Sequence, residues 1–357
     1  MSTPVRIGIL GNSFARKVQL PALRAVREDA PHEVVALCGH DRARALDTAR
    51  EWSIPVGTAD MDELVEQRPE LVLVTTPVDL HAPMVRTLIE ALPGAAVLCE
   101  KPFTLDAVEA EELVRLARGR LALVHHQLRW SPERRRMRAM IEEGFVGAPR
   151  RAHVELCLGS RAHLERPWCW WHDEARGGGV LGAIGSHLVD GVRWLLGEVE
   201  SVQGSLSTFV TQRADAQGRV HRVTADDHAE AWLRLESGAL CTLTTSIVMF
   251  HARPYVFEVH GEEGALRLEG EERLFAGKLD GEWARVEVEP LPVLAPELAS
   301  PFARQEPAFL RDLVHAVASR RRELPLAATF EDGLATQHVL DAIRRSSAAE
   351  HWIPCSV

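Results

Sequence analysis

Short apolar runs alternate with longer amphipathic segments along the first third of the chain. The apolar runs cover residues 7–10, 34–38, 71–74, 97–99 and 121–124. Segments with helical periodicity separate them, at residues 17–27, 42–52, 82–92 and 108–117. Strands that are apolar on both faces and alternate with helices are typical of a parallel sheet covered by helices. This part of the chain is predicted to form an α/β domain with a doubly wound parallel sheet.

Beyond residue 129 the strand pattern changes. Apolar residues at positions 231, 233 and 235 alternate with Trp232 and Arg234, and similar alternation recurs at residues 266–268 and 286–288. A period of two predicts an antiparallel sheet with one buried and one outward face. We therefore predict two domains, residues 1–128 and residues 129–357, the second an α+β domain with a large, mainly antiparallel open sheet. Helical patterns at residues 306–320 and 331–345 close the chain.

Length and charge exclude several classes of partner. The chain has 357 residues, which is long for one core, and a formal net charge of -10. This charge argues against nucleic acid or an anionic membrane as a partner. The basic clusters at residues 134–136 and 320–322 have helical patterns and acidic neighbours, so we expect them to be solvated helix faces. The sequence has no apolar run of about 18 residues, the length that spans a bilayer.

Cysteine usage and the first residues indicate the compartment. The six cysteines show neither a C-x-x-C pair nor zinc spacing, so they are predicted to be reduced and mostly buried thiols. His125 and His126 have no third ligand nearby, and no metal is predicted. Residues 1–6 lead directly into the first strand rather than into a secretion signal. We expect a cytoplasmic protein.

A glycine turn follows the first predicted strand and opens the first helix. At this position the backbone lets a pyrophosphate rest on helix N–H groups, which predicts a Rossmann dinucleotide site in residues 1–128. The second glycine expected after Gly11 is absent, and Ala15 arrives one position early. The predicted cofactor contacts in this turn are Gly8, Gly11, Asn12, Ser13 and Phe14.

The end of the second strand bears on the choice between NAD and NADP. Gly39 occupies the place where an NAD enzyme usually has an acid that binds the ribose 2′-hydroxyl. Without that carboxylate, His40, Arg42 or Arg44 can approach a 2′-phosphate, which favours NADP. Alternatively, Asp41 takes the acid's role after a small backbone shift, and the cofactor is NAD.

The ends of other strands supply the remaining predicted cofactor and substrate contacts of the first domain. Ligands of open α/β sheets bind at the carboxyl ends of the strands. Lys101 is predicted to direct a cation at the substrate, with a surface lysine before a turn proline as the alternative. Arg129 is expected to contact cofactor or substrate, or else to pair with an acid. The predicted cofactor contacts here are Thr75, Thr76, Pro77, His81, Glu100, Lys101 and Arg129.

A second glycine run, at residues 177–179, leads into a helix that carries His187 and Asp190. Their spacing of three places both on one side of the helix, and histidine exchanges a proton near neutral pH. A half-buried polar histidine is the alternative. Just before the glycines, Trp170 and Trp171 are predicted to offer a flat surface to a ring of the substrate or to fill a core, and His172 to make a polar substrate contact.

These motifs, in this order, resemble those of the Gfo/Idh/MocA family of nicotinamide-dependent oxidoreductases. The resemblance covers nearly the whole length and implies a cis Lys101-Pro102 bond. It further implies that Lys101 touches the reacting oxygen, that His187 accepts the proton when an alcohol is oxidised, and that Asp190 binds substrate or orients His187. One departure is Ala183, where many members have an aspartate four residues before the histidine.

We therefore predict an NAD(P)-dependent dehydrogenase that transfers a hydride between the nicotinamide and a CH–OH or C=O group of a sugar, inositol or related polyol. The catalytic residues would be Lys101, His187 and Asp190, and a homodimer or homotetramer is expected. Two alternatives are a regulatory protein that senses cofactor or sugar without turnover, and an NAD-assisted glycosidase.

Overall fold

The computed structural model of the protein describes residues 3–355. It divides into two compact units. The first comprises the chain up to Thr104, Val108–Trp130 and Leu291–Leu334. The second comprises Leu105–Ala107, Ser131–Pro290 and the chain from Ala335 onward. Residues 291–334 thus pack in the first unit although they follow the predicted boundary at residue 129.

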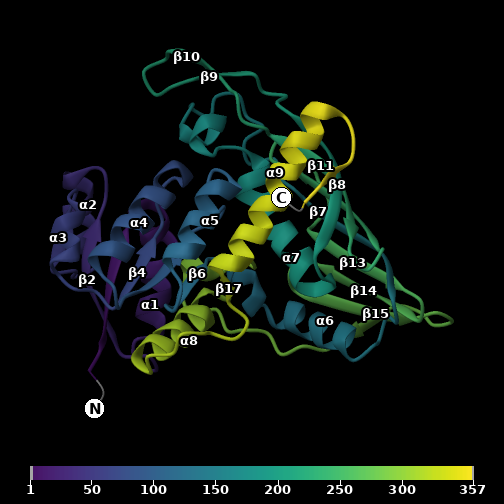
Figure 1. Ribbon diagram of the computed structural model, residues 1–357, viewed down its shortest axis with the longest axis horizontal. Helices are drawn as coiled ribbons and strands as arrows, with labels where there is room; N and C mark the ends of the chain where they lie inside the picture. The colour runs from purple at the N-terminus through teal and green to yellow at the C-terminus, as the bar shows by residue number, and fades with distance from the viewer. Residues whose placement is uncertain (1–2, 356–357) are drawn as a thin grey trace. The chain divides into compact units, whose positions relative to one another are not determined.

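A seven-stranded sheet forms the centre of the first unit, in the order β17-β6-β5-β4-β1-β2-β3 (Figure 1). The first six strands in the chain run parallel, and β17 is antiparallel to β6. The strands are β1 Val5–Leu10, β2 His32–Cys38, β3 Val56–Thr58, β4 Leu71–Val74, β5 Ala96–Cys99, β6 Ala122–Val124 and β17 Ala328–Thr329. The predicted doubly wound sheet is confirmed; β3 was not predicted, because three residues carry too little pattern.

Separate apolar cores cover the two faces of this sheet. In β4, Leu71 and Leu73 enter one core, and Val72 and Val74 enter the other. The first core contains side chains of α1 and α8, and the second contains side chains of α4 and α5. Burial on both sides explains why the strands are uniformly apolar. The helices are α1 Leu20–Val26, α2 Arg42–Glu51, α3 Met61–Val65, α4 His81–Ala91, α5 Ala107–Leu116 and α8 Glu306–Ala318.

The second unit is built on a nine-stranded sheet in the order β16-β15-β14-β13-β7-β12-β11-β8-β18. Only the β7–β12 pair of this sheet is parallel within the described residues. In β11 the residues at 229, 231, 233 and 235 are buried and those between them are exposed, which confirms the predicted alternation. The strands are β7 Pro149–Cys157, β8 Val199–Ser207, β11 His228–Leu235, β12 Leu240–Ser246, β13 Val256–Gly261, β14 Gly264–Glu269, β15 Arg273–Lys278, β16 Ala284–Val286 and β18 Ile353–Pro354.

Helices α6 and α7 pack against this sheet, α6 on β14 and β15 and α7 on β7. A small hairpin of β9 and β10 forms a separate two-stranded sheet. The bounds are α6 Pro132–Glu142, α7 Ser186–Leu196, β9 Gln212–Ala214 and β10 Val220–Arg222, and α9 spans Phe330–Ala349.

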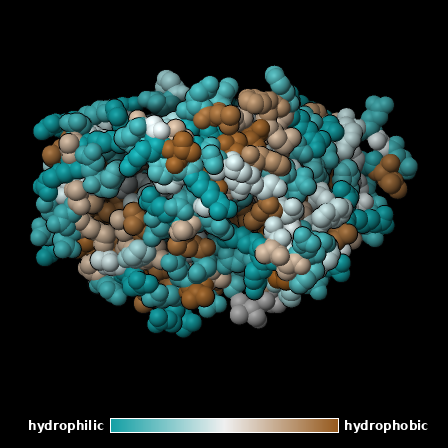
Figure 2. Space-filling view, turned by 90° about the horizontal axis from the view of Figure 1, so that it is seen from above, coloured by the Kyte–Doolittle hydropathy of each residue, from teal (hydrophilic) through white to brown (hydrophobic). Residues whose placement is uncertain are grey.

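The surface is mixed. On the face shown in Figure 2, apolar side chains are scattered among hydrophilic ones. Within residues 3–355, no helix has the length and apolar character needed to cross a membrane. Five cysteines are buried and Cys169 is partly exposed, and all six are free thiols, as predicted.

The prediction that residues 134–136 form a solvated face is wrong for Arg134. This side chain is buried and donates through Nε to Glu271 Oε2 at 2.8 Å and through Nη2 to the Tyr255 hydroxyl at 2.7 Å. Burial lowers the pKa of the guanidinium, but the charge of Glu271 outweighs it and holds the pKa above its usual value. The local helical pattern could not reveal a carboxylate that lies 137 positions later.

Removing the partner of a buried charge is strongly destabilising. We expect Glu271→Ala to lower the free energy of unfolding by about 3–5 kcal/mol, because it removes the carboxylate that pairs with the buried Arg134 guanidinium. Urea unfolding at pH 7 measures this. The control is Glu142→Ala, which removes the partner of Arg138 in an ion pair at the surface of the same helix and should cost less than about 1 kcal/mol. Equal losses in the two variants would contradict the assignment.

Candidate active site

The glycine turn after β1 requires glycine at one position for two reasons. Gly11 has φ +103°, and a Cβ atom there would lie 2.4 Å from Thr75 Oγ1 and 2.6 Å from the Thr75 carbonyl oxygen. Its N–H donates to the Cys38 carbonyl at 2.8 Å. Gly11 therefore brings the backbone of the turn against the ends of β4 and β2. Gly8 differs, because it lies inside β1 against Leu64 and Pro69 and serves packing.

The rest of the turn is held by α2. Asn12 Nδ2 donates to the Arg44 carbonyl at 3.2 Å, and its Oδ1 accepts from the Thr48 hydroxyl at 2.9 Å. Ser13 is exposed. The helical segment that follows contains one π-helical turn, Ala15–Gln19, which no side chain caps. The Phe14 ring lies edge-on to that of His125, with centroids 5.9 Å apart.

Asp41, just after β2, uses its carboxylate to cap a helix instead of leaving it available to a ribose hydroxyl. Asp41 caps α2 by accepting from the Arg44 N–H at 3.1 Å. Arg42 forms an exposed ion pair with Glu63 at 3.3 Å, and His40 is exposed. A Cβ on Gly39 would make ordinary contacts with Asn12 and Ala45 at 3.5 and 3.7 Å, so this position has room for a side chain.

Two turns at the ends of β4 and β5 are joined by His81. Its Nδ1 lies 3.1 Å from the Pro102 carbonyl oxygen and its Nε2 lies 2.9 Å from that of Thr76. Burial lowers the pKa of this ring, despite the opposing effect of the carbonyls and of Glu100. The Lys101-Pro102 bond is cis, as the family resemblance implied. His81 therefore braces the backbone of both turns.

Lys101 is partly exposed and follows the buried Glu100 directly in the chain. Burial lowers the pKa of its amine, and the adjacent Glu100 carboxylate opposes this shift. Glu100 hydrogen bonds to His125 Nδ1, and His125 Nε2 lies 2.8 Å from Glu306 Oε2. Arg129 is buried as well and donates to Asp332 Oδ2 at 3.3 Å, the acid partner that was its alternative assignment.

In the second unit, the glycine run is shaped by its neighbours. A Cβ on Gly178 would lie 2.4 Å from the Trp171 carbonyl oxygen, and one on Gly179, at φ +111°, would lie 2.2 Å from Asp226 Oδ1. Asp226 Oδ2 accepts from the Leu181 N–H at 2.7 Å, and the Asp226 carbonyl accepts from the Val180 N–H at 2.9 Å. Burial raises the pKa of this carboxyl to about 6. Asp226 thus anchors the start of the helical segment that leads to His187.

His187 and Asp190 have different surroundings on this segment, which begins with a π-helical turn, Leu181–Gly185, and continues as α7. His187 is partly exposed, whereas Asp190 is buried. The charge of Asp190 contributes to the raised pKa of Arg134. Asp190 therefore belongs to the buried ionic network around Arg134.

The tryptophan segment is packed by cations and rings of the same unit. Trp168 stacks on His221 with centroids 4.7 Å apart, and the Arg161 guanidinium lies 4.1 Å from the centroid of Trp171. Trp170 is partly exposed. His172 is buried, and its Nδ1 accepts from the Cys169 N–H at 3.1 Å. Burial and nearby Arg161 lower the pKa of His172 to about 4.

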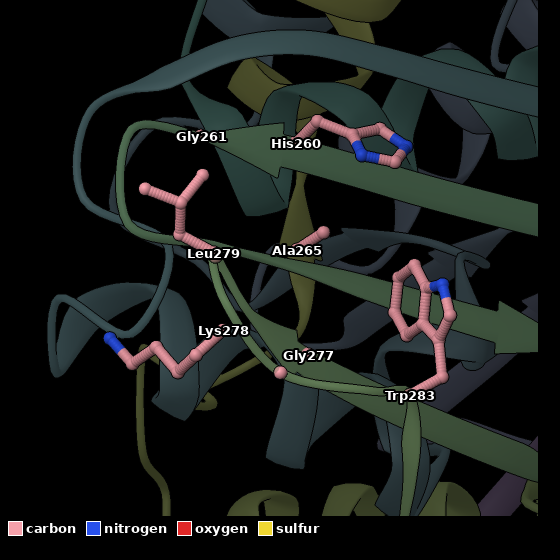
Figure 3. A pocket seen from close by; sticks show the side chains of 9 residues that line it. His260, Gly261, Ala265, Gly277, Lys278, Leu279 and Trp283 are labelled. Atoms are coloured by element: carbon pink, nitrogen blue, oxygen red, sulfur yellow. The ribbon is translucent and has the colours of Figure 1, made fainter.

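A hollow of about 270 Å³ lies elsewhere in the second unit, at the β13–β15 part of the sheet (Figure 3). His260 and Trp283 stand on one side of it, with ring centroids 6.4 Å apart. Lys278 donates to the Phe145 carbonyl at 2.8 Å. None of the predicted site residues lines this hollow.

Sequence reasoning missed Glu306 and Asp226. Glu306 lies in α8, 181 positions after His125, and its own segment reads as an ordinary amphipathic helix. Asp226 stands in a loop among other acids, 45 positions after Leu181. Local patterns contain no signal for either contact, because both depend on how distant segments pack.

The first unit has features that fit a dinucleotide. Gly11 forms a close-approach turn at the carboxyl end of β1, where the pyrophosphate of such a cofactor binds. Beside it, at the end of β4, the buried Thr76 Oγ1 has no hydrogen-bond partner in the part of the chain that the structure describes. A buried orphaned hydroxyl in this place is suited to a polar ligand atom.

Comparison with known proteins agrees with this geometry. Residues 5–127 match the model of the oxidoreductase family with an NAD-binding Rossmann fold, and residues 134–267 match that of the GFO/IDH/MocA C-terminal domain. The chain belongs to the Gfo/Idh/MocA family. It is thereby a member of a family of NAD-binding oxidoreductases, as predicted.

Among Gfo/Idh/MocA relatives, glucose-fructose oxidoreductase domain-containing protein 2 of Xenopus laevis is 32% identical, covering 99% of this chain and 94% of that protein. The crystal structure of an oxidoreductase domain protein from Kribbella flavida has a TM-score of 0.88 at 26% identity, covering 99% of this chain and 100% of that one. Levoglucosan dehydrogenase in complex with NADH and levoglucosan shares the fold, with a TM-score of 0.88 at 22% identity and coverage of 99% and 100%.

The Gly11 turn generates a test. We expect Gly11→Ala to lower the free energy of unfolding by about 2 kcal/mol or more, because the new methyl group needs an unfavourable φ and meets backbone atoms of Thr75. It should also weaken binding of NADH and NADPH, measured by fluorescence titration. Gly39→Ala is the matched control, expected to stay within about 1 kcal/mol of wild type. A Gly11→Ala protein of unchanged stability and nucleotide affinity would refute this assignment.

Proposed function

We propose that the protein is an NAD(P)-dependent dehydrogenase acting on a CH–OH or C=O group of a sugar, inositol or related polyol. One observation carries the proposal. Lys101 stands beside the buried Glu100 carboxylate at the carboxyl end of β5, in the same sheet whose β1 and β4 ends form the Gly11 and Thr76 turns. A cation thus stands at the sheet edge where a dinucleotide binds.

The residues that would hold the dinucleotide lie in the first unit. The backbone at Gly11 would accept the pyrophosphate, and the Thr76 hydroxyl would meet a polar atom of the nicotinamide half. When bound, the nicotinamide supplies hydride acceptance or donation. The protein itself would orient the reacting groups, stabilise charge on the substrate oxygen and transfer the hydroxyl proton.

Lys101 would stabilise negative charge on the substrate oxygen. A cation in a site of low dielectric constant acts more strongly on such a charge than one in water. His187 would exchange the proton of the substrate hydroxyl, because it is the partly exposed titratable group on its helix. Asp190, buried near Arg134, would position the helix, and Trp170 would offer a flat surface to a sugar ring.

Support for the sugar or polyol class comes from structural neighbours. One is levoglucosan dehydrogenase, with levoglucosan in one structure and L-sorbose in another. The WlbA dehydrogenase from Bordetella pertussis was solved with NADH and UDP-GlcNAcA. These neighbours share the fold, and the substrate class is our extension from them. A homodimeric or homotetrameric assembly and a cytoplasmic location stay predictions.

Ala183 favours one other function, that of a sensor. An aspartate at position 183 would place a carboxylate one helical turn before His187. Alanine has no such group, so one partner that could orient the His187 ring is missing. A sensor would bind NADH or NADPH and turn over none of a panel of sugars, inositols and amino sugars. Reduction of NAD or NADP by any panel member supports the dehydrogenase.

We expect Lys101→Ala and His187→Ala each to lower turnover at least about 100-fold while dinucleotide affinity stays within about threefold. The loss reflects the missing electrostatic or proton-transfer contribution to the transition state. Initial rates at 340 nm and NADH fluorescence titration measure the two quantities. Lys278→Ala and His260→Ala, at the hollow in the second unit, are controls that should retain wild-type turnover. Wild-type turnover in either site variant would refute that residue's role.

The end of β2 leads us to propose that the protein accepts NADP as well as NAD. Gly39 leaves room for the 2′-phosphate, and the Asp41 carboxylate is occupied as a helix cap. We expect Gly39→Asp to lower kcat/KM for NADP at least about tenfold relative to NAD, through repulsion of the phosphate. Gly39→Asn has the same size without the charge and should discriminate less. An unchanged NADP/NAD ratio in Gly39→Asp would show that the ribose lies elsewhere.

A further inference from the structure

His125 stands between two buried carboxylates of the first unit. Its Nδ1 contacts Glu100, at the end of β5, and its Nε2 contacts Glu306 of α8 at 2.8 Å. The side chains of His125 and Glu306 are 1% and 0% exposed, and that of Glu100 is 10% exposed. Three ionisable groups from two strand ends and a distant helix thus share one buried site.

This geometry favours the imidazolium. A neutral imidazole carries one N–H, so it can donate to only one of the two carboxylates, whereas the protonated ring donates to both. Burial by itself lowers the pKa of His125, but the charges of Glu100 and Glu306 outweigh burial and raise the pKa to about 10. The charge of His125 in turn lowers the pKa of Glu100, although burial opposes this.

The ring also contacts the dinucleotide turn. Phe14 meets it edge-on at 5.9 Å, and Phe309, three residues after Glu306 on α8, stacks against it at 5.4 Å. On the other side, the charge of Glu100 acts on Lys101 and His81, and its Oε2 lies 3.3 Å from the Lys101 N–H. One imidazolium therefore touches both the carboxylate beside Lys101 and the turn after β1.

We propose that His125 is a positioning residue. As an imidazolium paired with Glu100 and Glu306, it fixes the position of Lys101 at the end of β5 and that of Phe14 beside the Gly11 turn. It does not itself exchange protons with substrate, because both its nitrogens are bound to carboxylates. The kinetic part of this inference rests on the proposed function of Lys101. The four neighbouring ionisable groups alternate in charge, in the order Lys101, Glu100, His125 and Glu306. Each buried charge therefore has an opposite charge beside it.

The protonation state is tested by NMR of the histidine side chains between pH 5 and 9, with no dependence on activity. We expect one ring signal of imidazolium type that does not titrate in this range and is missing in His125→Gln. His32→Gln is the matched control, since His32 is buried in the same unit but its pKa is lowered by burial. A His125 signal of neutral type, or one that titrates near pH 6.5, would overturn the proposal.

Glu306→Gln serves as a second variant if His125→Gln does not fold. It keeps a hydrogen-bonding group of the same size and removes one charge, so His125 should lose protons at lower pH than in wild type. An unchanged His125 titration in Glu306→Gln would contradict the paired-carboxylate arrangement.

The positioning role is tested by kinetics. We expect His125→Gln to lower kcat about 10- to 100-fold, the size of effect that follows from misplacing a reacting group. In a Lys101→Ala background the same substitution should have a clearly smaller effect on kcat, since the part that acts through Lys101 is already lost. Additive losses would overturn the role. If the wild-type protein shows no turnover, the proposed dehydrogenase function is refuted, and the NMR test alone decides the protonation state of His125.

Stability gives a third readout with a definite sign. A histidine whose pKa is raised by folding stabilises the native state fully below its unfolded value of about 6.5, and this contribution is lost as pH rises through the folded value. The gap in Tm between wild type and His125→Gln should be largest below pH 6.5 and shrink toward pH 10. A gap that is constant over this range, or that widens with pH, would contradict a buried imidazolium.

Discussion

Burial of both faces of the seven-stranded sheet constrains where the first unit can carry chemistry. Side chains in the middle of the strands enter one of two apolar cores, so polar groups leave the sheet only at strand ends. The carboxyl ends of β1, β4, β5 and β6 supply Gly11, Thr76, Lys101 and His125 in turn. The arrangement of the candidate site in this unit follows from that restriction.

Two of the buried charges in this protein have partners that come from far along the chain. His125 is paired with Glu306, and Arg134 with Glu271. An unpaired ion in such surroundings would cost several kcal/mol. These pairs therefore tie together segments that have no local reason to meet. The segment at residues 291–334 packs in the first unit and contributes Glu306 and Phe309 to it.

In the second unit, close contacts with the backbone of the glycine run fix the start of the helical segment that carries His187. Gly178 and Gly179 are required because Trp171 and Asp226 approach the backbone too closely for any side chain. Asp226 then holds the start of the helical segment at Leu181. Ala183 stands in this segment without a carboxylate, so the position of His187 depends on the glycine turn, on Asp226 and on the burial of Asp190 near Arg134.

Sequence periodicity by itself determined the two sheet types, most of the alternating strands and helices of the first sheet and the strand-end turns, because these depend on side chains that alternate over a few residues. The motifs at Gly11, Lys101 and His187 were likewise visible locally. Tertiary structure decided which charges are buried and paired. Arg134 has the same local pattern as a solvated arginine, and the residues around His125 give no sign of Glu306, because Glu271 and Glu306 lie more than 100 positions from their partners. Desolvation, which depends on the whole packed unit, sets the charge state of such groups, and no short stretch of sequence contains that information.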